Sequence, residues 1–268
     1  MEPLPPTLPL SAFVALNSLY PVGLADQADI LARILPAFAI TFVFGLLAWG
    51  MRGVTARGAI GGALVTFVVT VAAGYGGFVT VLVVFGLTLF ATRFGLHRKL
   101  AAGIAERRGG RRGYQVLANL SAAGLTALPA IFYPRVAPLL FAAMTAALCE
   151  AAADTVSSEI GQAAGRRSHL ITNLQSVPAG TDGGITLQGT LAGIIAAWLV
   201  AATANWFEII PASWLPPAML AGVAGMLLDS VLGATVQRPG KLGNDSVNFI
   251  STVFAACLTL GYGLLLMS

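Results

Sequence analysis

The chain has 268 residues, of which 57% are hydrophobic and only 10% are charged, with a mean hydropathy of +0.82 and a formal net charge of +4. Soluble domains carry about 25% charged residues, so the composition excludes an ordinary soluble domain. It indicates an all-α, polytopic integral membrane protein. We expect membrane lipids rather than nucleic acid as its surroundings.

The first 34 residues are expected to form a separate N-terminal segment. Residues 8–25 are apolar but contain Pro21, and no Lys or Arg occurs before Arg33. A secretory signal needs a basic n-region, so we expect no cleavage. The segment is either interfacial or an extra span, and residues 35–268 are expected to form a single membrane-embedded catalytic domain.

Apolar windows of about 17–25 residues are long enough to cross a bilayer as helices. About eight such windows occur, at 35–51, 58–74, 76–92, 115–132, 136–153, 187–204, 214–234 and 246–266. The 31 glycines are typical of close helix–helix contacts in lipid. The sequence therefore predicts a membrane helical bundle with little room for a soluble domain.

Eight spans place four basic loops on one face, at 52–57, 93–112, 166–167 and 238–241. These loops hold thirteen of the fifteen Lys and Arg residues. The positive-inside rule makes that face cytoplasmic. We therefore expect a bacterial inner-membrane protein whose active face is cytoplasmic.

The longest basic loop, residues 93–112, ends next to a helix that carries amide side chains. Most of its charge sets topology and contacts anionic headgroups. Arg111 and Arg112 differ, because they adjoin Gln115 and Asn119, which lie one turn apart on the following helix. Two arginines at a helix entrance can hold a phosphate through paired hydrogen bonds, and we predict that they do so here.

Carboxylates cluster near the end of the fifth predicted span. An ionised carboxylate at mid-membrane costs about 2.5–3.5 kcal/mol, so acids there are functional candidates. Glu150, Asp154 and Ser158 share one helix face by their spacing of four residues, whereas Glu159 points elsewhere. Two acids four residues apart need a shared proton or a cation between them, and carboxylates with phosphate oxygens suit Mg²⁺. Alternatively, these acids cap the helix or pair with Arg166 and Arg167.

The loop after that span is rich in glycine, and Asp182 lies within it. Consecutive glycines let backbone N–H groups approach an anion closely. The loop therefore predicts a phosphate cradle made by Gly180, Gly183 and Gly184, although it lacks the Gly-Lys-Ser/Thr of a Walker loop.

The seventh span carries a stripe of small residues with one acid, Asp229, between Gly225 and Gly233. Either the stripe only packs against a neighbouring helix, with Asp229 hydrogen-bonded there, or Asp229 adds to the cation site. The eighth span then begins with three polar residues, Asn244, Asp245 and Asn248.

A faint internal repeat relates the start of the second span to the start of the sixth. Val54-Thr55 followed by Gly58 parallels Ile185-Thr186 followed by Gly189. Both segments enter the membrane from the same face, so any duplication is of the parallel kind.

Five ordered blocks resemble the domain-of-unknown-function 92 family of membrane proteins. They are Gln115–Asn119, Ala153–Gly161, Pro178–Thr190, Asp229–Ala234 and Asn244–Asn248. The family includes the plastid phytyl-phosphate kinase, and it is distantly similar to polyprenol kinases and CDP-diacylglycerol synthases, which use CTP with Mg²⁺. Those relatives carry Lys-Thr before a Glu-Gly turn where this chain has Ala179–Asp182, so the nucleotide does not carry over directly.

The resemblance implies a prenyl phosphate kinase that uses a nucleoside triphosphate, CTP first, to convert an isoprenyl monophosphate such as phytyl phosphate into the diphosphate. The catalytic candidates are Asp154, Glu159, Asp182 and Asp229, of which Asp154, Asp182 and Asp229 would hold Mg²⁺. The candidates for binding substrate and phosphate are Arg111, Arg112, Gln115, Asn119, Ser158, Gly180, Thr181, Gly183, Gly184, Asn244, Asp245 and Asn248.

Two other functions stay open, together with a homodimeric state. A membrane nucleotidyltransferase acting on a lipid phosphate would attack the α-phosphate with the same residues. A cation- or proton-coupled transporter would use the buried acids as a path. Acids spread through both leaflets would favour a transporter, but these acids gather on one side, which favours chemistry at the membrane surface.

Overall fold

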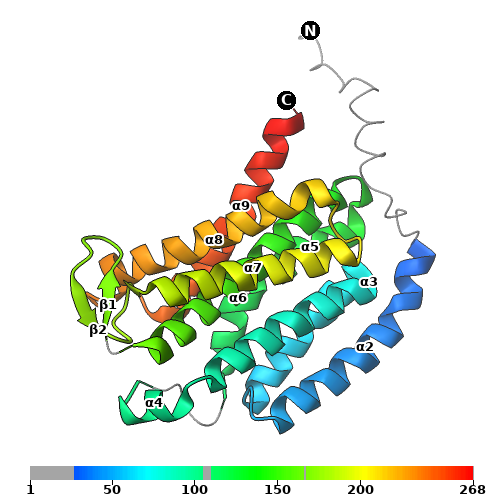
Figure 1. Cartoon of the computed structure of the whole chain (residues 1–268). Helices are drawn as coiled ribbons and strands as arrows, with labels where there is room; N and C mark the ends of the chain where they lie inside the picture. Colours follow the sequence, from blue (N-terminus) through cyan, green and yellow to red (C-terminus); the bar gives the residue numbers. More distant parts are fainter. Residues whose placement is uncertain (1–26, 105–109, 166, 268) are drawn as a thin grey trace.

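The computed structural model describes residues 27–104, 110–165 and 167–267, which fold into one bundle of long helices (Figure 1). Seven of the described helical segments are long and apolar enough to cross a membrane, which confirms the predicted all-α membrane class. The described helices are α2 (Gln27–Gly50), α3 (Ala56–Arg93), α4 (Leu96–Ala101), α5 (Gly113–Phe132), α6 (Ala137–Ala164), α7 (Leu187–Trp206), α8 (Leu215–Leu232) and α9 (Asn244–Met267). Most of the predicted N-terminal segment, and Arg107, Arg108 and Arg166, lie outside the described residues.

Helix α3 contains two of the predicted spans, joined by a sharp turn. Gly74 interrupts the helix with φ 66° and ψ −157°, a conformation that glycine adopts at little cost. The two arms then run back along each other, since Arg93 at the far end donates from Nη2 to Met51 O, just before the helix begins, at 2.6 Å. The seven apolar helical segments therefore provide eight crossings, as predicted.

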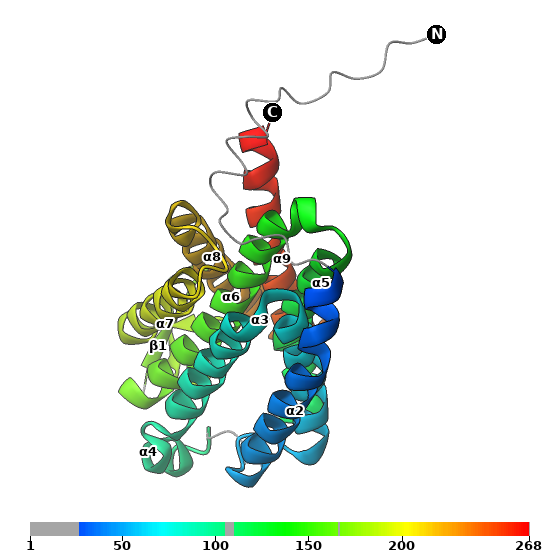
Figure 2. The same ribbon diagram turned by 90° about the vertical axis from the view of Figure 1, so that its right-hand side faces the viewer.

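Helix α6 forms the centre of the bundle. Of its most apolar window, 83% is buried, against 22–44% for the other six spans. Its buried face is rich in alanine, including Ala142, Ala146 and Ala153, and small side chains let neighbouring backbones approach closely. The helix also continues eleven residues beyond the predicted end at 153, so Asp154 and Glu159 lie on its last turns. Figure 2 shows α2 at the rim of the bundle, beside α3.

The segment between α6 and α7 folds into a small antiparallel sheet, where the sequence suggested only a loop. Strand β1 (Arg167–Leu170) lies between β2 (Ser176–Pro178) and β3 (Gly184–Ile185). Side chains of β1 alternate between exposed and buried, the two-residue period of a half-buried strand. The sheet fixes the glycine-rich loop between β2 and β3 against the bundle.

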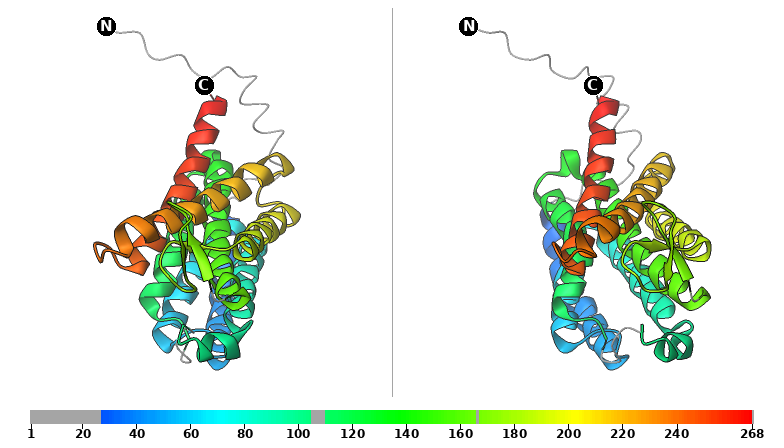
Figure 3. Two further views of the ribbon diagram at one scale, coloured as in Figure 1. Left: turned by 60° about the vertical axis from the view of Figure 1, so that its left-hand side comes forward. Right: turned by 90° about the vertical axis from the view of Figure 1, so that its left-hand side faces the viewer.

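The four loops that hold most of the basic residues, as far as they are described, meet at one end of the bundle, whereas Arg33 and Arg135 lie outside them. Thr55 N–H donates to Arg111 O at 2.9 Å, and Gln237 Nε2 donates to Asp182 Oδ1 at 2.9 Å. The views in Figure 3 show the small sheet beside the segment that follows α8. This geometry agrees with the predicted one-sided distribution of charge.

The predicted internal repeat has matching local structure. Thr55 caps α3 and accepts a hydrogen bond from Gly58 N–H at 3.2 Å, and Thr186 caps α7 and accepts one from Gly189 N–H at 3.0 Å. Both glycines pack closely, Gly58 against Arg111 O and Gly189 against Ser157 O. The repeat is thus a shared way of starting a helix at the same end of the bundle.

Candidate functional site

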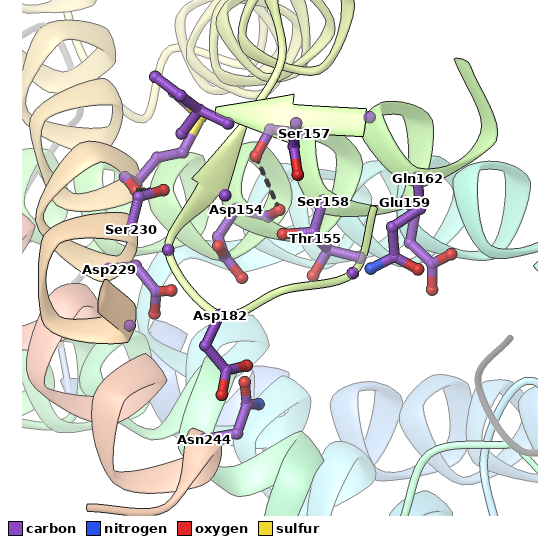
Figure 4. Close-up of a pocket in the computed structure, with 18 of the residues that line it drawn as sticks. Asp154, Thr155, Ser157, Ser158, Glu159, Gln162, Asp182, Asp229, Ser230 and Asn244 are labelled. Carbon is purple, nitrogen blue, oxygen red and sulfur yellow. Dashed lines mark hydrogen bonds between the residues drawn. The ribbon is translucent and has the colours of Figure 1, made fainter. Parts of the chain in front are cut away.

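A polar cavity of about 310 Å³ opens where the loops converge (Figure 4). Its walls come from the starts of α5 and α9, the last turns of α6, the loop between β2 and β3, and the end of α8. All predicted site residues except Arg112 and Asp245 line this cavity. Segments that are far apart in the sequence therefore form one site.

The two acids at the centre of the cavity come from different helices. The carboxyl groups of Asp154 on α6 and Asp229 on α8 lie close enough to act on each other electrostatically, and Figure 4 shows them pointing toward one another. Two carboxyl groups this close share a proton or hold a cation between them, since two bare negative charges repel. Both residues are among the three that the sequence predicted as ligands of a cation.

Helix packing brings Asp229 to this position. A Cβ on Gly225 would lie 2.6 Å from Glu150 Cγ, and one on Gly222 would lie 2.5 Å from Cys149 Cβ. The small residues thus allow α8 to lie directly on α6. The two interpretations of the stripe are compatible, because the same close contact that packs the helices sets Asp229 beside Asp154.

Polar side chains from α5 and α9 surround Asp229. Ser251 Oγ donates to Asp229 Oδ2 at 3.3 Å. One end of the Asn248 amide donates to Asn119 Oδ1 at 3.2 Å, and its other end lies 3.2 Å from Asp229 Oδ2. Asn119 in turn donates to Gln115 O at 2.8 Å. This chain of contacts connects the predicted amide residues to the acid pair.

Arg111 reaches the acids, but Arg112 does not. The Arg111 backbone is held by the turn before α3, with its N–H donating to Gly53 O at 3.1 Å. Its Nη1 donates to Thr155 Oγ1 at 3.2 Å, and its positive charge acts on Asp154. Arg112 is exposed and donates instead to the hydroxyl of Tyr114 at 2.7 Å. The structure therefore places one of the two predicted arginines in the cavity.

The glycine-rich loop covers the cavity from the side of the sheet. Gly180 and Gly183 have positive φ values of 82° and 75°. A Cβ on Gly183 would collide with Ala234, and one on Gly184 would lie 2.6 Å from Ser168 Oγ. The N–H groups of Thr181 and Gly184 already donate within the turn. Packing thus accounts for part of the glycine content, and the amides of Gly180, Asp182 and Gly183 are the candidates for a phosphate.

Asp182 lies at the mouth of the cavity, where Gln237 donates to it. A π-helical turn over Gly233–Gln237 presents Gln237 to the loop, and such turns are frequent at functional sites. Loss of solvent around the Asp182 carboxyl raises its pKa above the usual aspartate value, and the nearby positive charge of Arg238 lowers it in part.

Glu159 also borders the cavity but is held by a buried cation. Lys99 Nζ of α4 lies 2.5 Å from Glu159 Oε2, and the same ammonium donates to Thr92 O at 2.8 Å. The pair attaches the described part of the basic loop to α6. This contact favours a structural role for Glu159 over a place beside the other acids.

Glu150 lies one turn below Asp154 and is 1% exposed. Neither of its carboxyl oxygens has a hydrogen-bond partner among the described residues, and the charged groups that act on it are Asp154 and Asp229. A buried polar group without a partner costs free energy, so its position beside the pair marks it as a further candidate that the predicted site omitted.

The donor set fits Mg²⁺ held jointly with a substrate. Within the described ranges, no three His, Cys, Asp or Glu side chains are arranged as a metal site of their own. Mg²⁺ in phosphoryl-transfer sites is usually held by one or two carboxylates together with substrate phosphates and water. Asp154 and Asp229 satisfy that requirement, with Asp182 at the mouth of the cavity as the third predicted ligand.

Several other polar residues that line the cavity were not among the predicted ones. They are Thr155, Ser157, Gln162, Ser168, Thr186, Thr190, Ser230 and Gln237. Thr155 and Ser157 belong to the acid-rich run of α6, whose polar content is itself a signal in a membrane helix. Gln237 has no such signal, because it reaches Asp182 only through the π-helical turn.

Comparison with known proteins gives one family and several relatives. The family described as integral membrane protein DUF92 matches residues 39–256. An uncharacterized membrane protein of Synechocystis is 36% identical over 72% of this chain and 76% of its own length. Protein VTE6, chloroplastic, of Arabidopsis thaliana is 34% identical over 75% of this chain and 62% of its own length. An uncharacterized membrane protein of Methanocaldococcus jannaschii is 32% identical over 85% of this chain and 93% of its own length. No solved structure matches the chain significantly.

Proposed function

This chain belongs to the DUF92 family of integral membrane proteins. We propose that it phosphorylates an isoprenyl monophosphate with a nucleoside triphosphate, and that CTP is the first nucleotide to test. The product is the isoprenyl diphosphate. The observation that supports this proposal most is the meeting of Asp154, Asp229 and Arg111 in one polar cavity at the end of membrane helices. Two adjacent carboxyl groups can bind a cation, and an arginine can bind a phosphate.

The reaction requires positioning more than acid–base chemistry. A terminal oxygen of the acceptor phosphate forms a bond to the γ-phosphorus, the bond to the β–γ bridging oxygen breaks, and the nucleoside diphosphate leaves. The acceptor oxygen is already anionic, so no strong base is required. Phosphoryl transfer depends mainly on alignment and charge neutralisation, which the residues of this cavity can supply.

Each wall of the cavity has one role in this proposal. Asp154 and Asp229 hold Mg²⁺, which neutralises phosphate charge when it is bound. Arg111 binds the acceptor phosphate, and the Gly180–Gly184 loop contacts the phosphates of the nucleotide. Ser251 and the Asn248 amide, both within hydrogen-bond distance of Asp229 Oδ2, orient that carboxylate. Asn244 and Asp182 face each other across the mouth of the cavity (Figure 4) and bind the nucleotide side of the complex.

The purified protein tests the proposal directly. It should transfer label from a γ-labelled nucleoside triphosphate to phytyl or geranylgeranyl monophosphate in the presence of Mg²⁺ and release the nucleoside diphosphate. Transfer of label from the α-position, with release of pyrophosphate, would instead identify a nucleotidyltransferase. Failure of every nucleotide and every prenyl phosphate, in protein shown to be folded, would reject both enzymes and leave a transporter.

A further inference from the structure

A second cavity lies beside the polar one and has the opposite character. Its volume is about 460 Å³, within the size range of ligand sites. It lies between α2, the two arms of α3 and α5, and its apolar walls include Phe44, Val81, Val84, Phe85 and Leu120. Two threonines in the wall return their hydroxyl groups to their own helices, Thr66 to Gly62 O and Thr88 to Phe85 O. The body of the cavity therefore offers hydrocarbon contacts.

One end of this cavity is basic. Arg52, Arg93, His97 and Arg111 line it where the loops converge. Val81 lies twelve residues before Arg93 on the same helical arm, which at 1.5 Å per residue is about 18 Å deeper in the bundle. The cavity thus runs from positive charge at the polar end of the bundle to apolar side chains within the membrane-spanning region.

The two cavities share residues. Arg111 and Asn119 line both of them, and Ala151 of α6, one residue from Glu150, borders the apolar one. A molecule that filled the apolar cavity would therefore have its polar end at Arg111, next to the Asp154–Asp229 pair.

We infer that this cavity binds the single hydrocarbon chain of a long-chain phosphate monoester, with its phosphate at Arg111. The basic end selects an anionic headgroup, and the apolar body selects one chain inserted along the α3 arms. This inference deepens the proposed function and relies on it for the fate of the phosphate. According to this inference, the cavity walls formed by α2 and α3 determine which chain length of the substrate binds best.

Binding measurements on the full chain in detergent, without nucleotide, test this inference separately from catalysis. The probes are n-alkyl monophosphates of increasing length, with methyl phosphate as the headgroup alone and phosphatidic acid as a two-chain bilayer lipid. Each CH₂ that leaves water contributes about 0.8 kcal/mol, so the affinity, calculated from the concentration of probe that is free in water rather than in micelles, should rise roughly fourfold per carbon until the cavity is filled. Equal affinity for methyl phosphate, or tightest binding of phosphatidic acid, would overturn the inference.

Matched variants of the second α3 arm locate the chain. Val84→Trp adds volume to the wall and should move the best chain length toward shorter alkyl phosphates. Phe85→Ala removes volume and should move it toward longer ones, which keeps the test available if the tryptophan variant does not fold. Leu82→Trp, at a position that is 41% exposed on the same arm, should leave the optimum unchanged. Identical length profiles in all of these proteins would contradict the inference.

The outcomes separate the cavity from the reaction. Length-dependent binding without phosphoryl transfer would support the cavity and reject the proposed function. Transfer whose KM is the same for every chain length, in the parent and in both cavity variants, would support the proposed function and overturn the cavity assignment.

Discussion

The ammonium group of Lys99 lies 2.5 Å from Glu159 Oε2 across 60 positions of sequence, and the Lys99 side chain is fully buried. Its Nζ also donates to the carbonyl oxygens of Ala91 and Thr92, at the end of α3. This single cation therefore joins α3, α4 and α6 beside the candidate site.

We expect Lys99→Met to destabilise the protein strongly, because removal of one partner leaves the Glu159 carboxylate buried and unpaired, at a cost of about 3–5 kcal/mol. The double variant Lys99→Met/Glu159→Met should recover most of the stability and much of the activity. Thermal unfolding in detergent and turnover would be measured together, with the exposed Lys241→Met as a control. If the double variant is as stable as the parent but inactive, Glu159 has a catalytic role.

The acid pair gives the second prediction. Asp154→Asn or Asp229→Asn should abolish Mg²⁺-dependent turnover while leaving the protein extractable at normal yield, since asparagine preserves the size of each side chain. The double variant should be no worse than either single one, because residues that act as a unit are not additive. Asp245→Asn is the matched control, as Asp245 does not line the cavity. Full activity of purified Asp154→Asn would remove it from the metal site.

Arg111 and Arg112 are adjacent in sequence but face different surroundings, which allows a sharp comparison. Arg111→Gln should raise the KM for the acceptor about tenfold or more, because a hydrogen bond to a charged group contributes about 1.5–3 kcal/mol. Arg112→Gln should change KM little, since its side chain bonds to Tyr114. Equal effects of the two substitutions would mean that the loop acts only as diffuse positive charge.

Substitution of Glu150 can show whether the centre of the bundle keeps a destabilising carboxyl because the activity requires it. Glu150→Met keeps a long side chain beside Gly225 but removes the unpartnered carboxyl, so thermal stability without ligands should rise by about 1–3 kcal/mol. Turnover should fall, because an acid that acts on the Asp154–Asp229 pair is lost. Differential scanning fluorimetry and kinetics would show both changes. A variant that is more stable and equally active would leave Glu150 without a part in the site.

The sequence predicts the spans and most of the cavity because both depend on local signals. Apolar windows locate the helices, and an acid such as Asp154 in an apolar helix is conspicuous. It does not predict the partner of Glu159, since nothing near residue 159 points to Lys99. It also cannot separate Arg111 from Arg112, because their directions depend on how the start of α5 meets the turn before α3. The small sheet was missed because its strands have only two to four residues.

Topology provides the last prediction, and it does not depend on the reaction. The small sheet and the turn after α8 lie at the basic end of the bundle, whereas the turn after α7 lies at the other end, where Phe207 packs against Gly76 near the α3 turn. In a background without cysteines, Thr172→Cys and Lys241→Cys should react with an impermeant thiol reagent only from the cytoplasmic side, and Glu208→Cys only from the opposite side. All three positions are exposed, so access should depend on sidedness alone.

Labelling of Thr172→Cys and Lys241→Cys from opposite sides would contradict the eight-crossing arrangement and separate the Gly180–Gly184 loop from Asp229. Labelling of both from outside would keep the cavity intact but place it on the other face of the membrane, away from cytoplasmic nucleotides, and the kinase proposal would then be wrong.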